Sequence, residues 1–354
     1  MSRLCEYLLP IVLAIVTLIY FGQPEREEQQ PADYALQPTG VYYWCTTLGL
    51  TNVEYNWLKR NDIQRVYLRL FDITSEYGEP RPNASLKFLD IVDSTGVHHP
   101  GNVEDVLGDI EIVPTVFIVE DVFRNIESVD TLAKQMAQRV KKMGVTRHFK
   151  FSEIQLDCDW TATTRDAYFG FLTALRRELP GVSLSSTIRL HQLNQPVPPV
   201  DSGVLMVYNT GDIYAAPSDR NPILDLRDVK PYLPRLRKYD LPLSAAYPNF
   251  SWQLLYAGKE LKGILYNVDL DDKSTFAPTG PGRYKVVAAR TITMSMGGST
   301  IHLLPGEEVR AWRVSPEALH TVCEAVEKAR PGINANAIIY HLDEDNLLAV
   351  PTPL

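Results

Sequence analysis

Hydrophobic and polar positions follow two rhythms along the chain from Gly40 onward. Short runs rich in β-branched and aromatic residues alternate with segments whose apolar residues recur every three or four positions. This alternation is typical of parallel βα units. We expect eight strands: Val41–Cys45, Arg65–Phe71, Glu111–Ile118, Glu153–Asp159, Val182–Arg189, Val204–Tyr208, Leu241–Tyr247 and Ala337–Leu342. The pattern predicts an α/β fold, a single (β/α)8 barrel over residues 40–354.

Apolar spacing also predicts helices between these strands. The helix after the third strand is expected to end at Gly144, and its apolar face carries Val129, Leu132, Ala133, Met136, Val140 and Met143. A second helix is expected to start after Thr163 or Thr164. A third opens at Ser315, with an apolar side made of Leu319, Val322, Cys323 and Val326.

Residues 258–310 break this rhythm. They contain strand-like runs joined by Gly/Pro-rich turns and show little helical period. We therefore expect an antiparallel, β-rich insertion after the seventh barrel strand.

The segment before the barrel predicts export. Tyr7 to Phe21 is uncharged and mostly apolar and follows Arg3, as the hydrophobic core of a signal sequence follows a positive start. It is shorter than the roughly 20 residues that span a bilayer, so a cleaved signal peptide and a membrane anchor over residues 1–22 both stay open, with the anchor favoured. Residues 23–39 are polar and Pro-rich, which predicts a flexible tether. We expect a periplasmic or cell-surface protein held at the membrane by residues 7–21.

Composition removes several classes of function. The chain has 354 residues and a formal net charge of −8, with no Lys/Arg run, which argues against nucleic acid as a partner. It contains no CxxC pair, no HExxH motif and no Gly-rich phosphate loop, so we expect no metal and no cofactor. The three cysteines beyond the tether are widely spaced and odd in number, so a disulfide framework is not expected.

The strongest chemical signal lies on the fourth strand. Side chains alternate between the two faces of an extended strand, so Glu153, Gln155, Asp157 and Asp159 share one face. A buried parallel strand is normally apolar, and like charges two residues apart oppose each other. The inward face at the carboxyl end of a barrel strand opens into the active-site mouth. We therefore expect Asp157 and Asp159 to be functional; the alternative is a solvated strand end with a helix-capping Asp.

Around this strand the sequence resembles the chitinase-like barrels of glycoside hydrolase family 18. LDCDWT, before an amphipathic helix that ends in LRREL, is similar to the family motif DxDWE, and Met206-Val207-Tyr208-Asn209 is similar to its Met-x-Tyr-Asp. The chain also resembles a family of uncharacterised exported bacterial TIM barrels, in which a D-x-D pair precedes a Ser/Thr-rich turn, an Arg and a Tyr-bearing helix. In this chain those positions are Asp157, Asp159, Thr163, Arg165 and Tyr168.

Three departures bear on activity. The proton donor of family 18 is the Glu that ends DxDWE, and Thr161 stands there in this chain. A threonine side chain does not protonate a leaving group. Asn209 replaces the Asp of the sixth strand, and the eighth strand ends IIYHLD without the family's Trp. Catalysis by this chain would need carboxylates placed differently.

Carboxylates at strand ends supply the candidates. We expect Asp159 to act as acid or base, Asp157 as its electrostatic partner, and Asp343 or Glu120 as the second carboxylate that glycoside hydrolysis requires. A less favoured alternative is a metal site of Asp157, Asp159 and His191. Flat aromatic faces beside polar groups suit sugar rings, and the expected substrate-binding residues are Trp44, Trp160, Arg189, His191, Tyr208, Asn209 and Tyr247.

Three functional hypotheses follow. The first is a glycoside hydrolase-like enzyme that acts on a polysaccharide or glycan outside the cytoplasm. The second is a catalytically silent barrel that binds glycan, favoured by Thr161 and Asn209. The third and least favoured is a surface scaffold for protein contacts.

Overall fold

The computed structural model of the protein describes residues 36–92, 98–215, 218–293 and 300–349. The expected signal or anchor at Tyr7 to Phe21 and most of the expected tether lie outside the described residues. Within the described ranges, no helix is both long enough and apolar enough to cross a bilayer.

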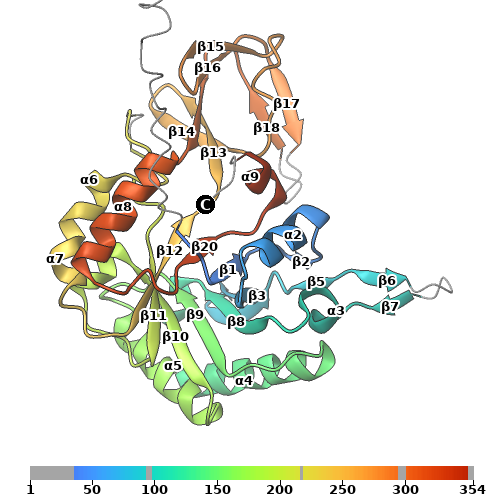
Figure 1. Ribbon diagram of the computed structural model, residues 1–354, viewed down its shortest axis with the longest axis vertical. Helices are drawn as coiled ribbons and strands as arrows, with labels where there is room; N and C mark the ends of the chain where they lie inside the picture. The colour runs from blue at the N-terminus through green and yellow to red at the C-terminus, as the bar shows by residue number, and fades with distance from the viewer. Residues whose placement is uncertain (1–35, 93–97, 216–217, 294–299, 350–354) are drawn as a thin grey trace, which may run out of the picture. The chain divides into compact units, whose positions relative to one another are not determined.

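The core of the fold is a closed barrel of parallel strands (Figure 1). β1 pairs with β20 on one side and with β3 on the other, through Gly40 opposite Ile338 and Gly40 opposite Arg65, and this double pairing closes the ring. The predicted α/β barrel is therefore confirmed. In order around the barrel the strands are β1 (Gly40–Tyr43), β3 (Arg65–Glu76), β8 (Glu111–Ile118), β9 (Glu153–Cys158), β10 (Ser183–Arg189), β11 (Ser202–Met206), β12 (Leu243–Pro248) and β20 (Ile338–Tyr340).

Three long helices form where the sequence predicts them. Ser128 caps α4 (Val129–Thr146) by accepting a hydrogen bond from the Thr131 amide, and Ser315 caps α8 (Pro316–Ala329) in the same way from Ala318. Thr164 precedes α5 (Arg165–Glu178). The shorter helices are α2 (Asn52–Arg60), α3 (Val103–Leu107), α6 (Leu226–Val229), α7 (Leu233–Leu236), α9 (Glu344–Ala349) and the 3₁₀ turns η1 (Glu120–Phe123), η2 (Leu190–Asn194) and η3 (Lys230–Tyr232).

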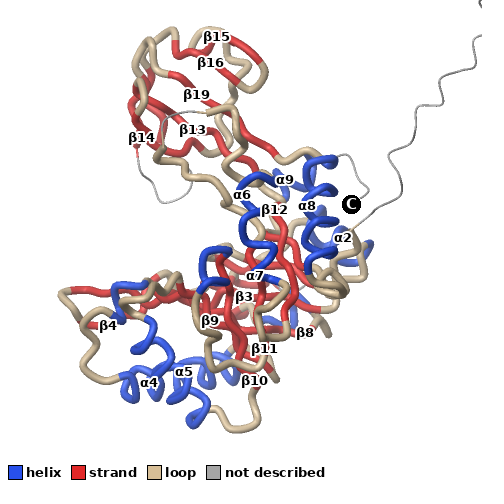
Figure 2. The backbone as a smooth tube through the Cα atoms, turned by 90° about the vertical axis from the view of Figure 1, so that its left-hand side faces the viewer, coloured by secondary structure: helices blue, strands red, loops and turns tan. Residues whose placement is uncertain are grey.

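The antiparallel insertion after the seventh barrel strand is also confirmed. Its five-stranded sheet has the order β14-β13-β19-β16-β15 and lies apart from the barrel strands (Figure 2). The sheet has its own apolar core, made of Leu255, Leu265, Phe276, Val286, Leu303 and Val309. Its strands, with the separate hairpin β17–β18, are β13 (Ser251–Ala257), β14 (Glu260–Leu265), β15 (Phe276–Gly280), β16 (Arg283–Val286), β17 (Arg290–Thr293), β18 (Thr300–Leu303) and β19 (Glu308–Arg313).

Two barrel strands, β3 and β11, show the differences from the sequence expectation that bear on the site. β3 runs on to Glu76 because it forms an antiparallel hairpin with β4 (Glu79–Asn83). β11 ends at Met206, so Tyr208 and Asn209 lie beyond the strand. Asn209 adopts φ 52°, a left-handed conformation that asparagine tolerates better than most residues. The remaining short strands are β2 (Thr47–Leu48), β5 (Lys87–Phe88), β6 (Asp90–Val92) and β7 (His98–Pro100).

The barrel interior is apolar on one side and polar on the other. Its buried cluster contains Tyr42, Tyr67, Val113, Val204, Met206, Tyr208, Ala246 and Ile338. Near the amino ends of the strands, Arg65 pairs with Glu111 at 2.8 Å and with Glu153 at 3.0 Å. The polar side of the interior runs along β9 and β10 toward the carboxyl ends, where barrel enzymes place their sites.

Candidate functional site

The inward face of β9 is a column of polar side chains, each with a partner. The Ser185 hydroxyl donates to Glu153 at 2.5 Å. The Tyr42 hydroxyl donates to the side-chain oxygen of Gln155 at 2.6 Å. The intervening residues, Ile154, Leu156 and Cys158, are buried on the other face. The alternation read from the sequence is therefore present in the strand.

Asp157 is the buried acid of this column. It is 3% exposed, accepts a hydrogen bond from the Thr187 hydroxyl at 2.6 Å, and lies 3.4 Å from the Arg189 guanidinium. The like charges of Asp157 and Asp159 were predicted to oppose each other, and the structure places the Arg189 guanidinium within ion-pair distance of both. Arg189 comes from the neighbouring strand β10, so one positive charge faces the two carboxylates.

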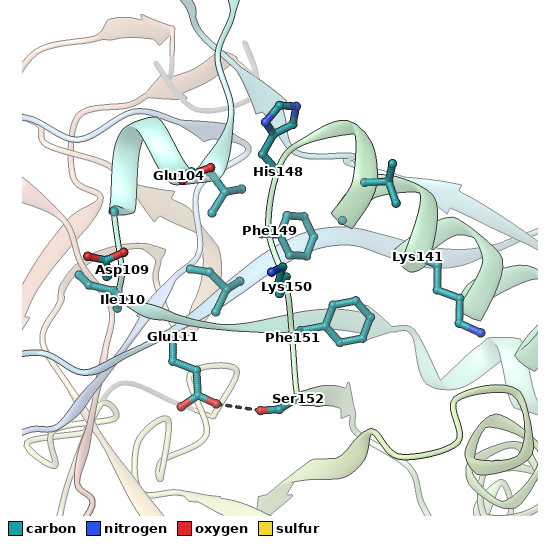
Figure 3. Close-up of a pocket in the computed structure, with 15 residues that line it drawn as sticks. Glu104, Asp109, Ile110, Glu111, Lys141, His148, Phe149, Lys150, Phe151 and Ser152 are labelled. Carbon is teal, nitrogen blue, oxygen red and sulfur yellow. Dashed lines mark hydrogen bonds between the residues drawn. The ribbon is translucent and has the colours of Figure 1, made fainter.

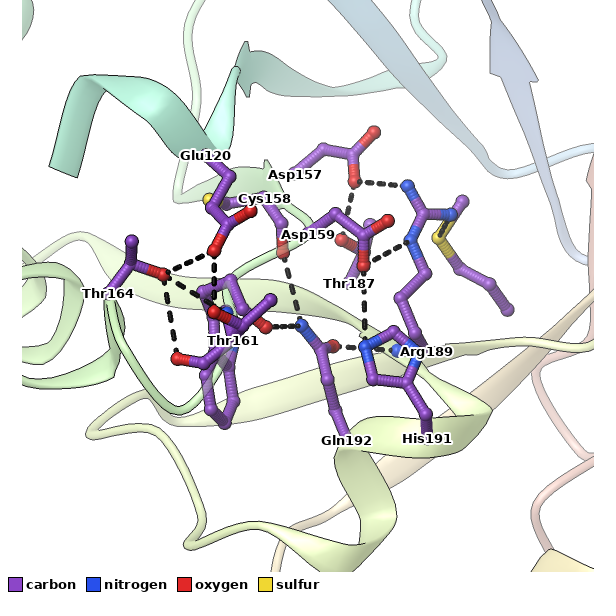
Figure 4. Close-up of polar contacts among 12 residues, drawn as sticks. Glu120, Asp157, Cys158, Asp159, Thr161, Thr164, Thr187, Arg189, His191 and Gln192 are labelled. Atoms are coloured by element: carbon purple, nitrogen blue, oxygen red, sulfur yellow. Dashed lines mark hydrogen bonds and ion pairs between the residues drawn. The ribbon is translucent and has the colours of Figure 1, made fainter. Parts of the chain in front are cut away.

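Asp159 directly follows β9 and is exposed. Its carboxylate lies 3.7 Å from Nε of Arg189 and 3.6 Å from Nε2 of His191 (Figure 4). Gln192 holds the two strand ends together, because its buried side chain accepts from the Arg189 amide at 2.8 Å and donates to the Trp160 carbonyl at 3.0 Å. One guanidinium thus serves two carboxylates at the barrel mouth.

Glu120 reaches the same region from η1, the turn that follows β8. Its Oε1 accepts hydrogen bonds from the hydroxyls of Thr161 at 2.6 Å and Thr164 at 3.1 Å (Figure 4). Its Oε2 accepts from Arg124 at 3.3 Å. The residue at the position of the family acid, Thr161, therefore contacts another carboxylate.

A pocket of about 370 Å³ brings these groups together. It is lined by Phe117, Ile118, Val119, Glu120, Asp159, Thr161 and His191. Of the predicted catalytic residues, Glu120 and Asp159 line the pocket, and Asp157 lies behind it. Sequence reasoning missed Phe117 as a lining residue. Its place two residues after Thr115, on the inward alternation of β8, was the available signal.

Asp343 lies elsewhere. It accepts hydrogen bonds from the side-chain amide of Asn346 and from the Asp345 backbone amide, so it caps α9 instead of lining the pocket. Of the two candidates for the second carboxylate, Glu120 is the one beside Asp159.

Two predicted sugar-binding aromatics are placed wrongly for that role. Trp160 is completely buried, with its ring 5.1 Å from that of Phe169 and stacked with Tyr168 on α5. Tyr247 is also completely buried and donates to Asn334 at 2.7 Å. Both rings pack outward from the barrel because they occupy the alternate face of their strand segments.

Other aromatic residues gather at the mouth. Tyr208 stacks on Tyr340 with ring centroids 4.5 Å apart, and half-buried Trp44 lies 5.8 Å from Tyr340. Arg69 lies over the Trp44 ring at 5.3 Å. Asn209, after Tyr208, is exposed. Burial raises the pKa of the Tyr340 hydroxyl, and the charge of Asp157 raises it further, so this phenol stays protonated at neutral pH.

The alternative metal site is not assembled. Arg189, a cation, contacts both Asp157 and Asp159 where the metal would have to lie. Among the described residues, no group of three or more His, Cys, Asp or Glu side chains converges in a way that would hold an ion.

Another pocket, shown in Figure 3, lies beside the amino ends of β8 and β9. Its volume is about 1040 Å³, and it surrounds Glu111, where β8 begins, and Ser152, which precedes β9. The Ser152 hydroxyl donates to Glu111 at 3.1 Å. Glu111 is already paired with Arg65, which compensates its charge. The mouth, with Asp159 and Glu120 directed into one pocket, is the better candidate.

Comparisons with known proteins give structural likenesses only. No family model matches the chain, and no curated protein matches it significantly. The spore cortex-lytic enzyme SleL of Bacillus cereus is similar in structure at 12% identity, covering 88% of this chain and 73% of that one, with a TM-score of 0.49. A family 18 chitinase from Cycas revoluta is similar at 12% identity, covering 87% of this chain and 96% of that one, with a TM-score of 0.44. Human YKL-39, described as a pseudo-chitinase, is similar at 10% identity, covering 87% of this chain and 93% of that one, with a TM-score of 0.43. The roles of residues in this chain therefore rest on their own contacts.

Proposed function

We propose that the protein is a glycoside hydrolase that acts on a glycan outside the cytoplasm, with its site at the barrel mouth. One observation carries the proposal. The exposed carboxylate Asp159 shares the single Arg189 guanidinium with the buried carboxylate Asp157, beside a pocket that also holds Glu120. Two carboxylates facing one pocket are the minimal equipment for glycosidic bond cleavage.

The contacts favour Asp159 as the proton donor. Asp157 is buried and its Oδ1 accepts from both Thr187 and Arg189, so it lies behind the pocket as the electrostatic partner. Asp159 is exposed and lines the pocket, where its carboxyl can give a proton to a glycosidic oxygen. His191, 3.6 Å from Asp159, is placed to exchange that proton with solvent.

A glycan array followed by product analysis tests this function. The chain from residue 37 onward is applied to the array, and every bound glycan is then incubated with the protein and examined for released sugar. We expect Asp159→Asn to lower kcat by about 10²- to 10⁴-fold while glycan binding persists, because general acid catalysis contributes that much. Asp121→Asn is the matched control, since Asp121 is an exposed neighbouring acid that does not line the pocket.

The second candidate is a silent glycan-binding barrel. It is favoured by Thr161 at the position of the family acid and by the exposed Asn209 at the position of the family Asp. Binding of an oligosaccharide with no product over long incubation would establish this candidate and defeat the hydrolase. Release of sugar that is undiminished in Asp159→Asn would keep the hydrolase and reject Asp159 as its acid.

The location is part of the proposal. We propose that Tyr7 to Phe21 directs the chain across a membrane and anchors it there, which the uncharged, apolar character of this segment and the preceding Arg3 support. Cells that express a C-terminally tagged chain are fractionated and treated with protease from outside. A protease-sensitive membrane fraction is expected, and release of a shortened chain would indicate a cleaved signal. A protected cytosolic chain would contradict export.

A further inference from the structure

We infer that Glu120 is the second carboxylate of this site and acts as its base, and that Thr161 and Thr164 are its positioning residues. The inference rests on the proposed function and deepens it. It places the second catalytic carboxylate after β8, whereas the family's acid stands after β9. The juxtaposition that carries it is the Thr161 hydroxyl, 2.6 Å from Oε1 of Glu120.

Glu120 is held in one orientation by residues distant in sequence. Thr161 and Thr164 both donate to Oε1, and the Thr161 amide donates to the Thr164 hydroxyl at 3.0 Å, which fixes the two threonines relative to each other. Thr164 is completely buried. Because two hydroxyls hold one oxygen, the carboxylate plane is defined before any ligand arrives.

The other oxygen stays available. Within the described part of the chain, Oε2 of Glu120 is contacted by Arg124 at 3.3 Å, and the Arg124 side chain is 56% exposed. The Glu120 side chain is 19% exposed and lines the pocket together with Asp159 and His191. A carboxylate that lines a pocket, with one oxygen held by two hydroxyls and the other contacted by an exposed arginine, is suited to contact a ligand.

The hydrogen bonds define the role. In each of its three contacts Glu120 accepts, and the hydroxyls of Thr161 and Thr164 both bind Oε1, so we assign to Glu120 the role of the proton acceptor. In the step we infer, the Asp159 carboxyl gives its proton to the glycosidic oxygen as the bond from that oxygen to the anomeric carbon breaks, and the bonding electron pair stays on the oxygen. A water attacks the anomeric carbon, and its proton passes to Glu120. Exchange with solvent returns both carboxyl groups to their starting state.

The role explains Thr161. In the family that the sequence resembles, the position after Asp-Trp carries the acid itself. In this chain that position carries the short Thr161 side chain, whose hydroxyl donates a hydrogen bond to Glu120 from the turn η1. Threonine at position 161 thus takes the place of the family's acid and at the same time holds Glu120.

The test uses two substrates for each variant of the full chain. One is the oligosaccharide that the wild-type protein cleaves, and the other is the 2,4-dinitrophenyl glycoside of the sugar it releases, whose leaving group needs no protonation. Asp159→Asn is expected to lose 10²- to 10⁴-fold on the oligosaccharide and to keep most of its rate on the dinitrophenyl glycoside. Glu120→Ala is expected to lose activity on both, and sodium azide is expected to restore turnover with a glycosyl azide as product.

The positioning residues have their own readouts. Thr161→Val is expected to lower kcat about tenfold with little change in KM and to shift the acidic limb of the pH–rate profile, whereas Thr161→Ser restores both. Asp121→Asn, which alters the neighbouring acid that also contacts Arg124, should match the wild type. Thermal unfolding of each variant confirms folding, and Glu120→Gln replaces Glu120→Ala if the alanine variant is unfolded.

The outcomes separate this inference from the proposed function. A wild-type rate on the oligosaccharide in Glu120→Ala, or an equal loss in Asp121→Asn, overturns the role of Glu120 and leaves the hydrolase standing. Absence of azide rescue together with retained activity of Glu120→Ala on the dinitrophenyl glycoside also overturns it. A wild-type protein that makes no product from any array glycan defeats the proposed function, and this inference falls with it.

Discussion

The Arg189 guanidinium lies 3.4 Å from the Asp157 carboxylate inside the barrel mouth, and the two side chains come from adjacent parallel strands. Asp157 is almost fully buried, and the Arg189 side chain is 21% exposed. Removing one partner of a buried ion pair leaves the other charge without compensation, which costs more than the pair itself contributes.

Asp157→Asn is therefore expected to destabilise the protein by roughly 3 kcal/mol in the free energy of unfolding, measured by urea denaturation. The double variant Asp157→Asn/Arg189→Met should recover much of the lost free energy of unfolding, because it leaves no buried arginine charge without a partner. A single Asn variant as stable as the wild type would show that Arg189 is satisfied by Asp159 alone.

Phe117 and Trp160 should respond in opposite ways to truncation. Phe117 lines the pocket, so Phe117→Ala is expected to weaken glycan binding about tenfold with a small change in stability. Trp160 is buried against α5, so Trp160→Ala should lower the free energy of unfolding by about 3–5 kcal/mol. Calorimetric titration with an array-positive oligosaccharide and urea denaturation distinguish the two. Equal effects on binding from both variants would contradict the buried position of Trp160.

His341 should make stability depend on pH. Burial lowers the pKa of its imidazole, and the nearby Asp343 charge only partly offsets this. The unfolded state then binds more protons than the folded state once the pH falls below about 6.5. Stability should fall with decreasing pH in that window, with a slope of at most about 1.4 kcal/mol per pH unit from this residue.

The His341→Asn variant isolates that contribution. Its free energy of unfolding between pH 7.5 and pH 5.5 should decline less than that of the wild type. The exposed His148 provides the control, and His148→Asn should keep the wild-type slope. Identical slopes in all three proteins would assign the pH dependence to other groups.

The cysteines should resist alkylation. Burial raises the pKa of the Cys45 thiol to about 11 and that of Cys323 to about 12. The thiolate is the reactive form, so iodoacetamide at pH 8 should modify neither at an appreciable rate in the folded protein. Mass spectrometry of tryptic peptides measures the modification, and urea-unfolded protein provides full labelling. Rapid labelling of folded Cys323 would contradict its burial.

The sequence by itself determined the architecture and the strand that carries the acids. Hydrophobic periodicity is local, so β8 was predicted at its observed bounds and β9 to within one residue, and period-two alternation placed Asp157 and Asp159 on the inward face. Thr187 and Arg189 lie two positions apart on β10, so the same alternation puts them on one face of that strand. These results needed no knowledge of which strands are neighbours.

Only the tertiary structure decided how the charges are partnered and which candidates meet. Three contacts show this: Arg189 pairs with Asp157, Glu120 accepts from Thr161, and Asp343 caps α9 instead of lining the pocket. Each depends on which strands are neighbours and on the path of the loops that follow them. Loop conformation has no periodic signal, and a contact between residues 41 positions apart leaves no mark in either segment alone. Trp160 shows the same limit: it lies two positions past the end of β9, and its burial follows from the packing of its ring against Tyr168 and Phe169 of the next helix, which is a property of the folded chain.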